Sequence, residues 1–220
     1  MVLTWQIRWA LKPLVFLACL IPAAHLALGA LNTAGVSNFG NVSLGADPVN
    51  LLLHTCGRWA LNFLMITLCM TPLRDLTHSV FWLRFRRMFG LFVVFYVLLH
   101  FTIYLTLDQE GNLRALGQDV VKRPYITIGM IGLLLLIPLA ITSTAKAQRR
   151  LGRRWTRLHR LVYVIAALGV WHFWWQVKKD IREPLLYACG LSLLLGYRVW
   201  KQRKALSRFS ASLFAKPGAA

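Results

Sequence analysis

Six apolar stretches, each close to the length of a membrane span, restrict the fold of this chain more than any other feature. A hydrocarbon core about 30 Å thick needs about 20 mostly apolar residues per helix. The stretches run over Pro13–Leu31, Leu51–Thr71, Met88–Leu107, Tyr125–Ser143, Leu158–Val177 and Pro184–Val199. They are rich in leucine and show no apolar–polar alternation, which excludes a membrane β-barrel. We therefore predict an all-α integral membrane protein with a six-helix transmembrane bundle.

The composition agrees with a membrane-embedded chain. Of the 220 residues, 57% are hydrophobic and 15% are charged, whereas soluble proteins average about 45–50% apolar and about 25% charged residues. This apolar content also excludes a disordered chain. The first stretch follows Arg8 and Lys12 and ends in Ala-Leu-Gly-Ala, as a cleaved signal peptide does. Because the stretch is long for a signal peptide and five more follow it, we expect it to be retained as a helix.

Basic residues are distributed unequally between two sets of connecting segments. One set, together with the C-terminal segment, holds 19 Lys and Arg residues and a single acid, Asp75. The opposite set holds seven Lys and Arg residues and six acids. Cytoplasmic segments of membrane proteins carry the excess of positive charge. We therefore expect both termini to be cytoplasmic, and we read the net charge of +19 as a topology signal rather than a nucleic-acid surface.

The connecting segments are too short to hold another folded domain. We divide the chain into a cytoplasmic N-terminal segment (1–12), a transmembrane domain (13–200) and a basic cytoplasmic tail (201–220). No internal repeat stands out, and neither a GxGxxG motif nor a P-loop is present. The four cysteines lie inside the apolar stretches without metal-binding spacing, as buried small hydrophobes do. We therefore expect the activity to reside within the bilayer.

Histidines inside the apolar stretches are the first candidate functional residues, because ionisable side chains are costly in hydrocarbon. His25, His54, His100 and His172 lie in or near the ends of the predicted spans. Counted from the cytoplasmic start of their spans, His100 and His172 lie roughly 18 and 21 Å deep at about 1.5 Å per residue. The two histidines therefore share one level in the outer half of the bilayer.

Two neutral imidazoles at one depth on facing helices are suited to clamp an iron porphyrin. We therefore predict His100 and His172 as the ligands of a haem iron. His159 begins the fifth span, roughly 20 Å below His172, at a depth that suits a second haem. Against a second haem, His159 and His172 fall on different faces of a straight helix. The third span also offers Arg86 and Arg87, not histidine, at the lower level.

The remaining polar side chains leave alternatives open. His54 and Arg58 share one helix face near the outer surface and form either a haem propionate site, an outer haem ligand or an interfacial pair. Arg86 and Arg87 are suited to haem propionates, a flavin phosphate or lipid headgroups. For His25 and His78 we expect only hydrogen bonds to neighbouring helices.

Several short motifs, in a fixed order, resemble a known family. They are Arg86-Arg87, Leu98-Leu99-His100, Lys122-Arg123-Pro124-Tyr125-Ile126-Thr127, Arg149-Arg150-Leu151-Gly152-Arg153-Arg154-Trp155 and Leu158-His159-Arg160-Leu161-Val162-Tyr163, with His172 closing the fifth span. In this order they resemble the haem-binding membrane subunits of bacterial periplasmic methionine sulfoxide reductases. Those subunits are part of the ferric-reductase-like transmembrane family, which includes the NADPH oxidases. The resemblance extends from about His54 to Trp175.

The resemblance implies b-type haem between the third and fifth spans, which maps onto His100 and His172, with His159 as a further or alternative ligand. One haem, or two, is implied, together with FMN, for which we find no phosphate-binding motif. The implied protein crosses the bacterial inner membrane several times and takes electrons from the quinone pool or from a flavin reductase. It passes them to a periplasmic molybdenum-cofactor partner, MsrP, which repairs oxidised methionine in proteins.

The chain departs from the oxidases of that family in two respects. Its third span holds a single histidine, His100, and the length leaves no room for a flavin and nicotinamide domain. We therefore expect an external electron donor and a non-catalytic electron-transfer subunit of an oxidoreductase. Two alternatives remain: a free-standing quinol-dependent or metal reductase of the same fold, and a haem-free transporter that uses its histidines as a proton relay.

Overall fold

The computed structural model describes residues 10–37, 43–177 and 180–214. Some sequence predictions fall outside the described residues. These include most of the N-terminal segment with Arg8, the outer basic residues Lys178 and Lys179, and the end of the tail with Lys216.

Throughout these residues the regular structure is helical, which confirms the all-α prediction. The elements are α2 (Lys12–Thr33), α3 (Pro48–Thr77), α4 (Leu83–Ile103), the π-helical turn η2 (Tyr104–Asp108), α5 (Leu113–Lys122), α6 (Pro124–Ile141), α7 (Ala145–Leu151), α8 (Arg153–Leu158), α9 (Leu161–Gln176) and α10 (Arg182–Phe214). Each predicted apolar stretch lies mainly on one of six long helices. The short helices α5, α7 and α8 occupy connections for which we predicted no structure.

Among the described residues, four helices are long and apolar enough to cross a membrane: α2, α3, α4 continued through η2, and α6. Helix α9 has only 16 residues, fewer than the roughly 20 that a span perpendicular to the bilayer needs. Helix α10 has 33 residues, and its second half carries the basic tail. The crossing of the bilayer by α9 and α10 therefore stays a prediction.

Local sequence signals explain where the central helices begin and end. At the start of α3 the Asp47 carboxylate accepts a hydrogen bond from the Asn50 backbone N–H (3.1 Å), and Pro48 occupies the first turn. Proline is favoured there because the first N–H groups of a helix have no partner inside the helix. Pro124 starts α6 in the same way. Helix α3 ends at Thr77, and the next residue, His78, caps it in the left-handed conformation with a φ of 51°.

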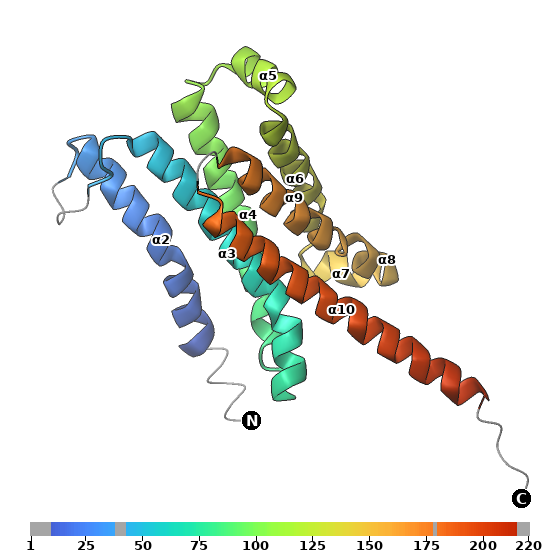
Figure 1. Cartoon of the computed structure of the whole chain (residues 1–220). Helices are drawn as coiled ribbons and strands as arrows, with labels where there is room; N and C mark the ends of the chain where they lie inside the picture. The colour runs from blue at the N-terminus through green and yellow to red at the C-terminus, as the bar shows by residue number, and fades with distance from the viewer. Residues whose placement is uncertain (1–9, 38–42, 178–179, 215–220) are drawn as a thin grey trace, which may run out of the picture.

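Helices α3 and α4 pack along each other, as do α6 and α9, and the two pairs meet around one core (Figure 1). Buried side chains of all four helices form this core, and those of α3 and α4 include the aromatic residues Phe63, Phe92 and Tyr96. The ring of Phe63 lies 5.4 Å from that of Phe92 and 5.3 Å from that of Tyr96. Helices α2 and α10 flank the four central helices, and α10 extends beyond them towards the C-terminus (Figure 1).

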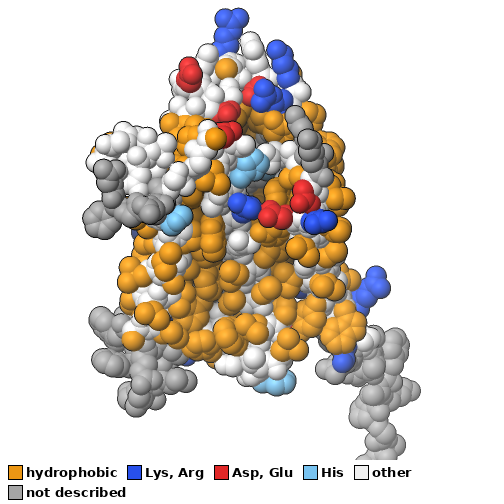
Figure 2. All heavy atoms as spheres, turned by 60° about the vertical axis from the view of Figure 1, so that its left-hand side comes forward, with side chains coloured by type: hydrophobic (Ala, Val, Ile, Leu, Met, Phe, Trp, Pro, Cys, Tyr) orange, Lys and Arg blue, Asp and Glu red, His pale blue; other side chains and the backbone are white. Residues whose placement is uncertain are grey.

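The outward faces of the bundle are apolar. Leu14 on α2, Leu134 on α6 and Leu193 on α10 are 66%, 58% and 75% exposed. Figure 2 shows hydrophobic side chains over much of one face, with most of the visible charged side chains in its upper half. An apolar exterior of this extent is the surface that a helical membrane protein presents to lipid.

Candidate functional site

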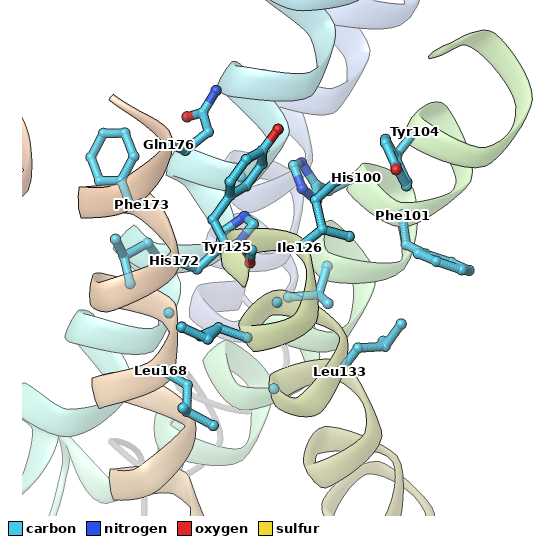
Figure 3. A pocket seen from close by; sticks show the side chains of 18 of the residues that line it. His100, Phe101, Tyr104, Tyr125, Ile126, Leu133, Leu168, His172, Phe173 and Gln176 are labelled. Atoms are coloured by element: carbon cyan, nitrogen blue, oxygen red, sulfur yellow. Dashed lines mark hydrogen bonds between the residues drawn. The ribbon is translucent and has the colours of Figure 1, made fainter. Parts of the chain in front are cut away.

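A cavity of about 330 Å³ lies between α3, α4, α6 and α9. Most of its wall is aliphatic, and its polar residues include two histidines, His100 from α4 and His172 from α9. Ligand pockets in proteins show the same combination of an apolar wall and a few converging polar groups. The described structure therefore places both predicted haem ligands in one ligand-sized cavity (Figure 3).

The two imidazole rings lie close to each other in this cavity. Their centres are 6.2 Å apart, and their planes are nearly perpendicular, at 87°. A metal–imidazole bond is about 2 Å long, so two rings that share one metal ion have centres roughly 6 Å apart. The observed separation fits that arrangement.

Hydrogen bonds to backbone carbonyls orient both rings. His100 Nδ1 lies 3.0 Å from the Leu53 carbonyl oxygen on α3, and His172 Nδ1 lies 2.7 Å from the Tyr125 carbonyl oxygen on α6. A carbonyl only accepts hydrogen bonds, so Nδ1 carries the proton in each ring. The lone pair is thereby left on Nε2, which is the state in which neutral histidine binds a metal.

The kind of metal group that fits follows from the number of ligands. The described residues contain no cluster of three or more His, Cys, Asp or Glu side chains that could hold a metal ion. Two histidines alone therefore leave most coordination positions of an iron ion to another donor. A porphyrin supplies four nitrogen ligands and needs only axial ligands from the protein. The residues present fit an iron porphyrin better than a bare metal ion.

A set of polar residues, which we call the rim, surrounds one end of the cavity. His54, Arg58 and Arg123 line the cavity there together with Gln176. His54 Nε2 lies 2.9 Å from the Gln176 amide nitrogen, which links α3 to α9. Arg58 forms an ion pair with Glu183 of α10 (3.2 Å). The predicted pair of His54 and Arg58 thus reaches the cavity with both side chains already partnered.

Arg123 is a rim residue that our sequence interpretation did not single out. Its Nε lies 3.3 Å from the Asp119 carboxylate of α5. The Tyr125 side chain, reinforced by the Asp119 charge, raises the pKa of the Arg123 guanidinium. The rim therefore holds two permanent cations, each next to a carboxylate.

His159 lies away from this cavity. Its ring stacks on Trp155 with a centre-to-centre distance of 3.9 Å, and its Nδ1 faces the Trp155 carbonyl oxygen at 3.2 Å. Its Nε2 is buried and has no hydrogen-bond partner among the described residues. Arg86 and Arg87 do not line the cavity either; Arg86 is half-buried and Arg87 is exposed. The structure thus brings His100, His172, His54 and Arg58 together and leaves the other candidates apart.

The two remaining histidines, His25 and His78, do not line the cavity. His25 is exposed on α2, and His78 is the exposed residue that caps α3.

Gly57 of α3 and Gly129 of α6 lie directly against the rings of His100 and His172. Our sequence interpretation did not identify these glycines, although each lies the same number of residues before its histidine.

Comparison with known proteins assigns the family. The ferric reductase like transmembrane component family matches residues 56–170, which is more than half of the chain. No solved structure matches the chain significantly.

Curated relatives cover most of the chain. A protein of Xanthomonas campestris pv. campestris (strain B100), named protein-methionine-sulfoxide reductase heme-binding subunit MsrQ, is 54% identical over 181 residues, 81% of this chain and 83% of the relative. The protein of the same name from Xanthomonas oryzae pv. oryzae (strain MAFF 311018) is 50% identical over 209 residues, 94% of each chain. That of Brucella anthropi (strain ATCC 49188) is 51% identical over 170 residues, 76% of this chain and 77% of the relative. The chain therefore belongs to the ferric-reductase-like transmembrane family and, within it, to the MsrQ subunits.

Proposed function

We propose that this chain is the b-type cytochrome subunit of a protein-methionine-sulfoxide reductase and holds haem iron between His100 and His172. The observation that carries the proposal is the pair of Nδ1-protonated imidazoles, 6.2 Å apart, inside one apolar cavity. The names of the relatives support it, because they describe heme-binding subunits of such reductases.

A haem bound in this cavity supplies one-electron transfer. The protein supplies the ligands, their orientation and the electrostatic surroundings. Hydrogen bonds from Nδ1 to the carbonyls of Leu53 and Tyr125 make both imidazoles more basic ligands. The wall of the cavity is mostly aliphatic, and the rim cations Arg58 and Arg123 are suited to propionates if these replace Glu183 and Asp119 as their carboxylate partners.

The proposed topology has six spans, both termini in the cytoplasm, and the rim near the periplasmic surface of the inner membrane. The distribution of basic residues supports this orientation, because the rim end of the bundle has the connections with a nearly balanced charge. In this arrangement residues 13–200 form the membrane domain, and 1–12 and 201–220 are cytoplasmic.

The electron route that we propose runs from the quinone pool, or from a cytoplasmic flavin reductase, to a periplasmic molybdenum-cofactor reductase, MsrP, which repairs oxidised proteins. The haem position near the rim supports delivery to the periplasmic side, because His100 and His172 lie next to that end of the cavity. FMN is proposed as an additional cofactor from the family resemblance alone.

We also retain His159 as the ligand of a second, inner haem. Its buried Nε2 without a partner among the described residues supports this assignment, since a buried polar atom normally has one. Arg86 and Arg87, on the neighbouring helix α4, are proposed contacts for propionates or for a flavin phosphate.

The deciding experiment is pyridine haemochrome quantitation on detergent-purified protein, run on the unchanged chain and on His100→Ala, His172→Ala and His159→Ala. We expect the first two variants to lose the haem at the cavity, because each removes one of its two protein ligands. If His159 holds a second haem, His159→Ala loses one haem and keeps the other.

Other results would redirect the assignment. Full haem content in His100→Ala and His172→Ala would exclude the cavity as the haem site. A colourless unchanged protein from haem-sufficient cells would favour the proton-relay alternative. Quinol oxidation in membranes that lack any molybdenum partner would favour a free-standing reductase.

A further inference from the structure

Each of the two histidines in the cavity is held by the same arrangement of a glycine and a backbone carbonyl on a neighbouring helix. In each case the ring of a histidine packs against a glycine of the neighbouring helix, and Nδ1 faces the carbonyl oxygen one helical turn before that glycine. On one side the residues are Leu53, Gly57 and His100. On the other side they are Tyr125, Gly129 and His172.

The match extends to the sequence spacing. The carbonyl residue precedes the histidine by 47 positions in both cases, and the glycine follows the carbonyl residue by four. A threonine stands two positions before each glycine, in Thr55-Cys56-Gly57 and Thr127-Ile128-Gly129, and a phenylalanine follows each histidine. The hairpin of α3 and α4 and the pair of α6 and α9 thus share this arrangement of a carbonyl, a glycine and a histidine.

A steric argument explains why glycine stands at these two positions. The carbonyl of a helical residue points towards the residue four positions later and still has a lone pair for a second hydrogen bond. A side chain on that later residue would stand between the carbonyl and an approaching ring. A Cβ on Gly57 would lie 3.3 Å from His100 Nδ1, and a Cβ on Gly129 would lie only 2.8 Å from His172 Nδ1.

We propose that Gly57 and Gly129 are positioning residues that keep each imidazole on its carbonyl, so that Nε2 of both rings is presented to the iron. This inference rests on the proposed haem ligation by His100 and His172. It assigns the ligand-holding role to two matched helix pairs, α3 with α4 and α6 with α9, on either side of the cavity.

The two glycines differ in how much space they leave. A methyl group at Gly129 would meet both Nδ1 and Cε1 of His172 below 3.0 Å, so the ring has to move. A methyl group at Gly57 would be 3.3 and 3.4 Å from the corresponding atoms of His100, so a shift of a few tenths of an ångström suffices. Alanine at position 129 therefore disturbs its histidine more than alanine at position 57.

The test compares Gly129→Ala and Gly57→Ala with Gly90→Ala as the control. Gly90 lies on α4, outside the cavity, and its added Cβ would have no other group within 4 Å. The measurements are haem per chain, the midpoint potential of the haem and its low-spin electron paramagnetic resonance spectrum. Overpacking of a tight site weakens binding steeply, and we expect haem affinity to fall by about tenfold or more in Gly129→Ala.

We expect Gly57→Ala to keep its haem with altered resonance positions and a more positive midpoint potential. The reason is that a weakened Nδ1–H···O=C bond makes the ligand less basic, which destabilises the ferric state. Gly90→Ala should match the unchanged protein in all three measurements. Unchanged haem content, potential and spectrum in Gly129→Ala would overturn the proposal.

A second comparison separates ring positioning from helix packing. In a His172→Ala background the ring that the new methyl group would strike is gone, so adding Gly129→Ala should leave folding yield and thermal midpoint unchanged. An equal loss of stability in both backgrounds would assign Gly129 to helix packing and overturn its positioning role. If His172→Ala itself retains its full haem content, the proposed haem ligation fails. If His172→Ala loses haem but the glycine variants match the unchanged protein in haem content, midpoint potential and spectrum, the ligation stands and this inference fails.

Discussion

The sequence leaves several roles open for His54, and the contacts of its side chain reduce their number. Its position four residues before Arg58 left a propionate contact, an outer haem ligand and an interfacial pair as alternatives. In the structure its Nε2 faces the Gln176 amide at 2.9 Å, so the nitrogen that would bind iron is already engaged. Sequence alone could not indicate this, because Gln176 lies on a different helix, 122 positions away.

We therefore predict that His54→Gln keeps the full haem content of the unchanged protein. A glutamine at this position still offers a polar side chain to Gln176 and supplies no imidazole. Pyridine haemochrome quantitation beside His100→Ala measures the outcome. Loss of one haem in His54→Gln would instead make His54 an axial ligand.

The two histidines of the site were predictable from the sequence, whereas their partners were not. His100 and His172 could be paired from their depth, because the rise of a helix converts sequence position into distance. Their packing against Gly57 and Gly129 could not be predicted in the same way. Which helix lies against which is a tertiary fact, and apolar periodicity is nearly uniform on spans that are hydrophobic all round.

Tyr96 connects helix α4 to helix α2. Its hydroxyl donates to the Cys19 carbonyl oxygen (2.8 Å) and accepts from the Ala23 backbone N–H (3.1 Å). These two backbone groups are four residues apart, the spacing that pairs them within a regular helix. The tyrosine is fully buried, next to Pro22 in the middle of α2. One side chain thus satisfies both backbone groups at the proline-containing turn.

We predict that Tyr96→Phe destabilises the protein, because it removes the hydroxyl partner of both backbone groups at a buried position. Leaving a buried hydrogen-bonding group without its partner costs about 1–3 kcal/mol. The thermal unfolding midpoint in detergent should fall, and it should fall less in Tyr187→Phe, because Tyr187 is half-buried and its hydroxyl donates to a side chain, that of Asn62. Equal midpoints for the unchanged protein and Tyr96→Phe would contradict this role.

The helices themselves were largely predictable, but their lengths and the short connecting helices were not. Long apolar runs predict a helix in a membrane, because a single segment can pair its backbone N–H and C=O groups within itself only as a helix. The end of α9 at Gln176 and the extension of α10 to Phe214 differ from the predicted ends at Val177 and Val199. Helix α5 was missed because Leu113–Lys122 is amphipathic and too short to resemble a span.

For the whole molecule, the charge distribution makes the topology testable. We predict that green fluorescent protein fused to the C-terminus fluoresces, whereas alkaline phosphatase at the same site is inactive. Alkaline phosphatase inserted after Gly117, in the connection between α4 and α6, should be active because that connection is expected in the periplasm. The opposite pattern of activities would invert the orientation and place the rim at the cytoplasmic face.

The ion pairs of the rim have a consequence for the proteins that meet each face of this subunit. Arg58 and Arg123 are each neutralised by a carboxylate at 3.2–3.3 Å, so the rim presents little net field to an approaching molecule. The other end of the molecule carries most of the 26 basic residues of the chain and almost no acids. Long-range attraction between exposed charges fades beyond about 10 Å at 0.1 M salt. Encounters at the basic end are therefore governed by ionic strength, whereas encounters at the rim are governed by shape and contact.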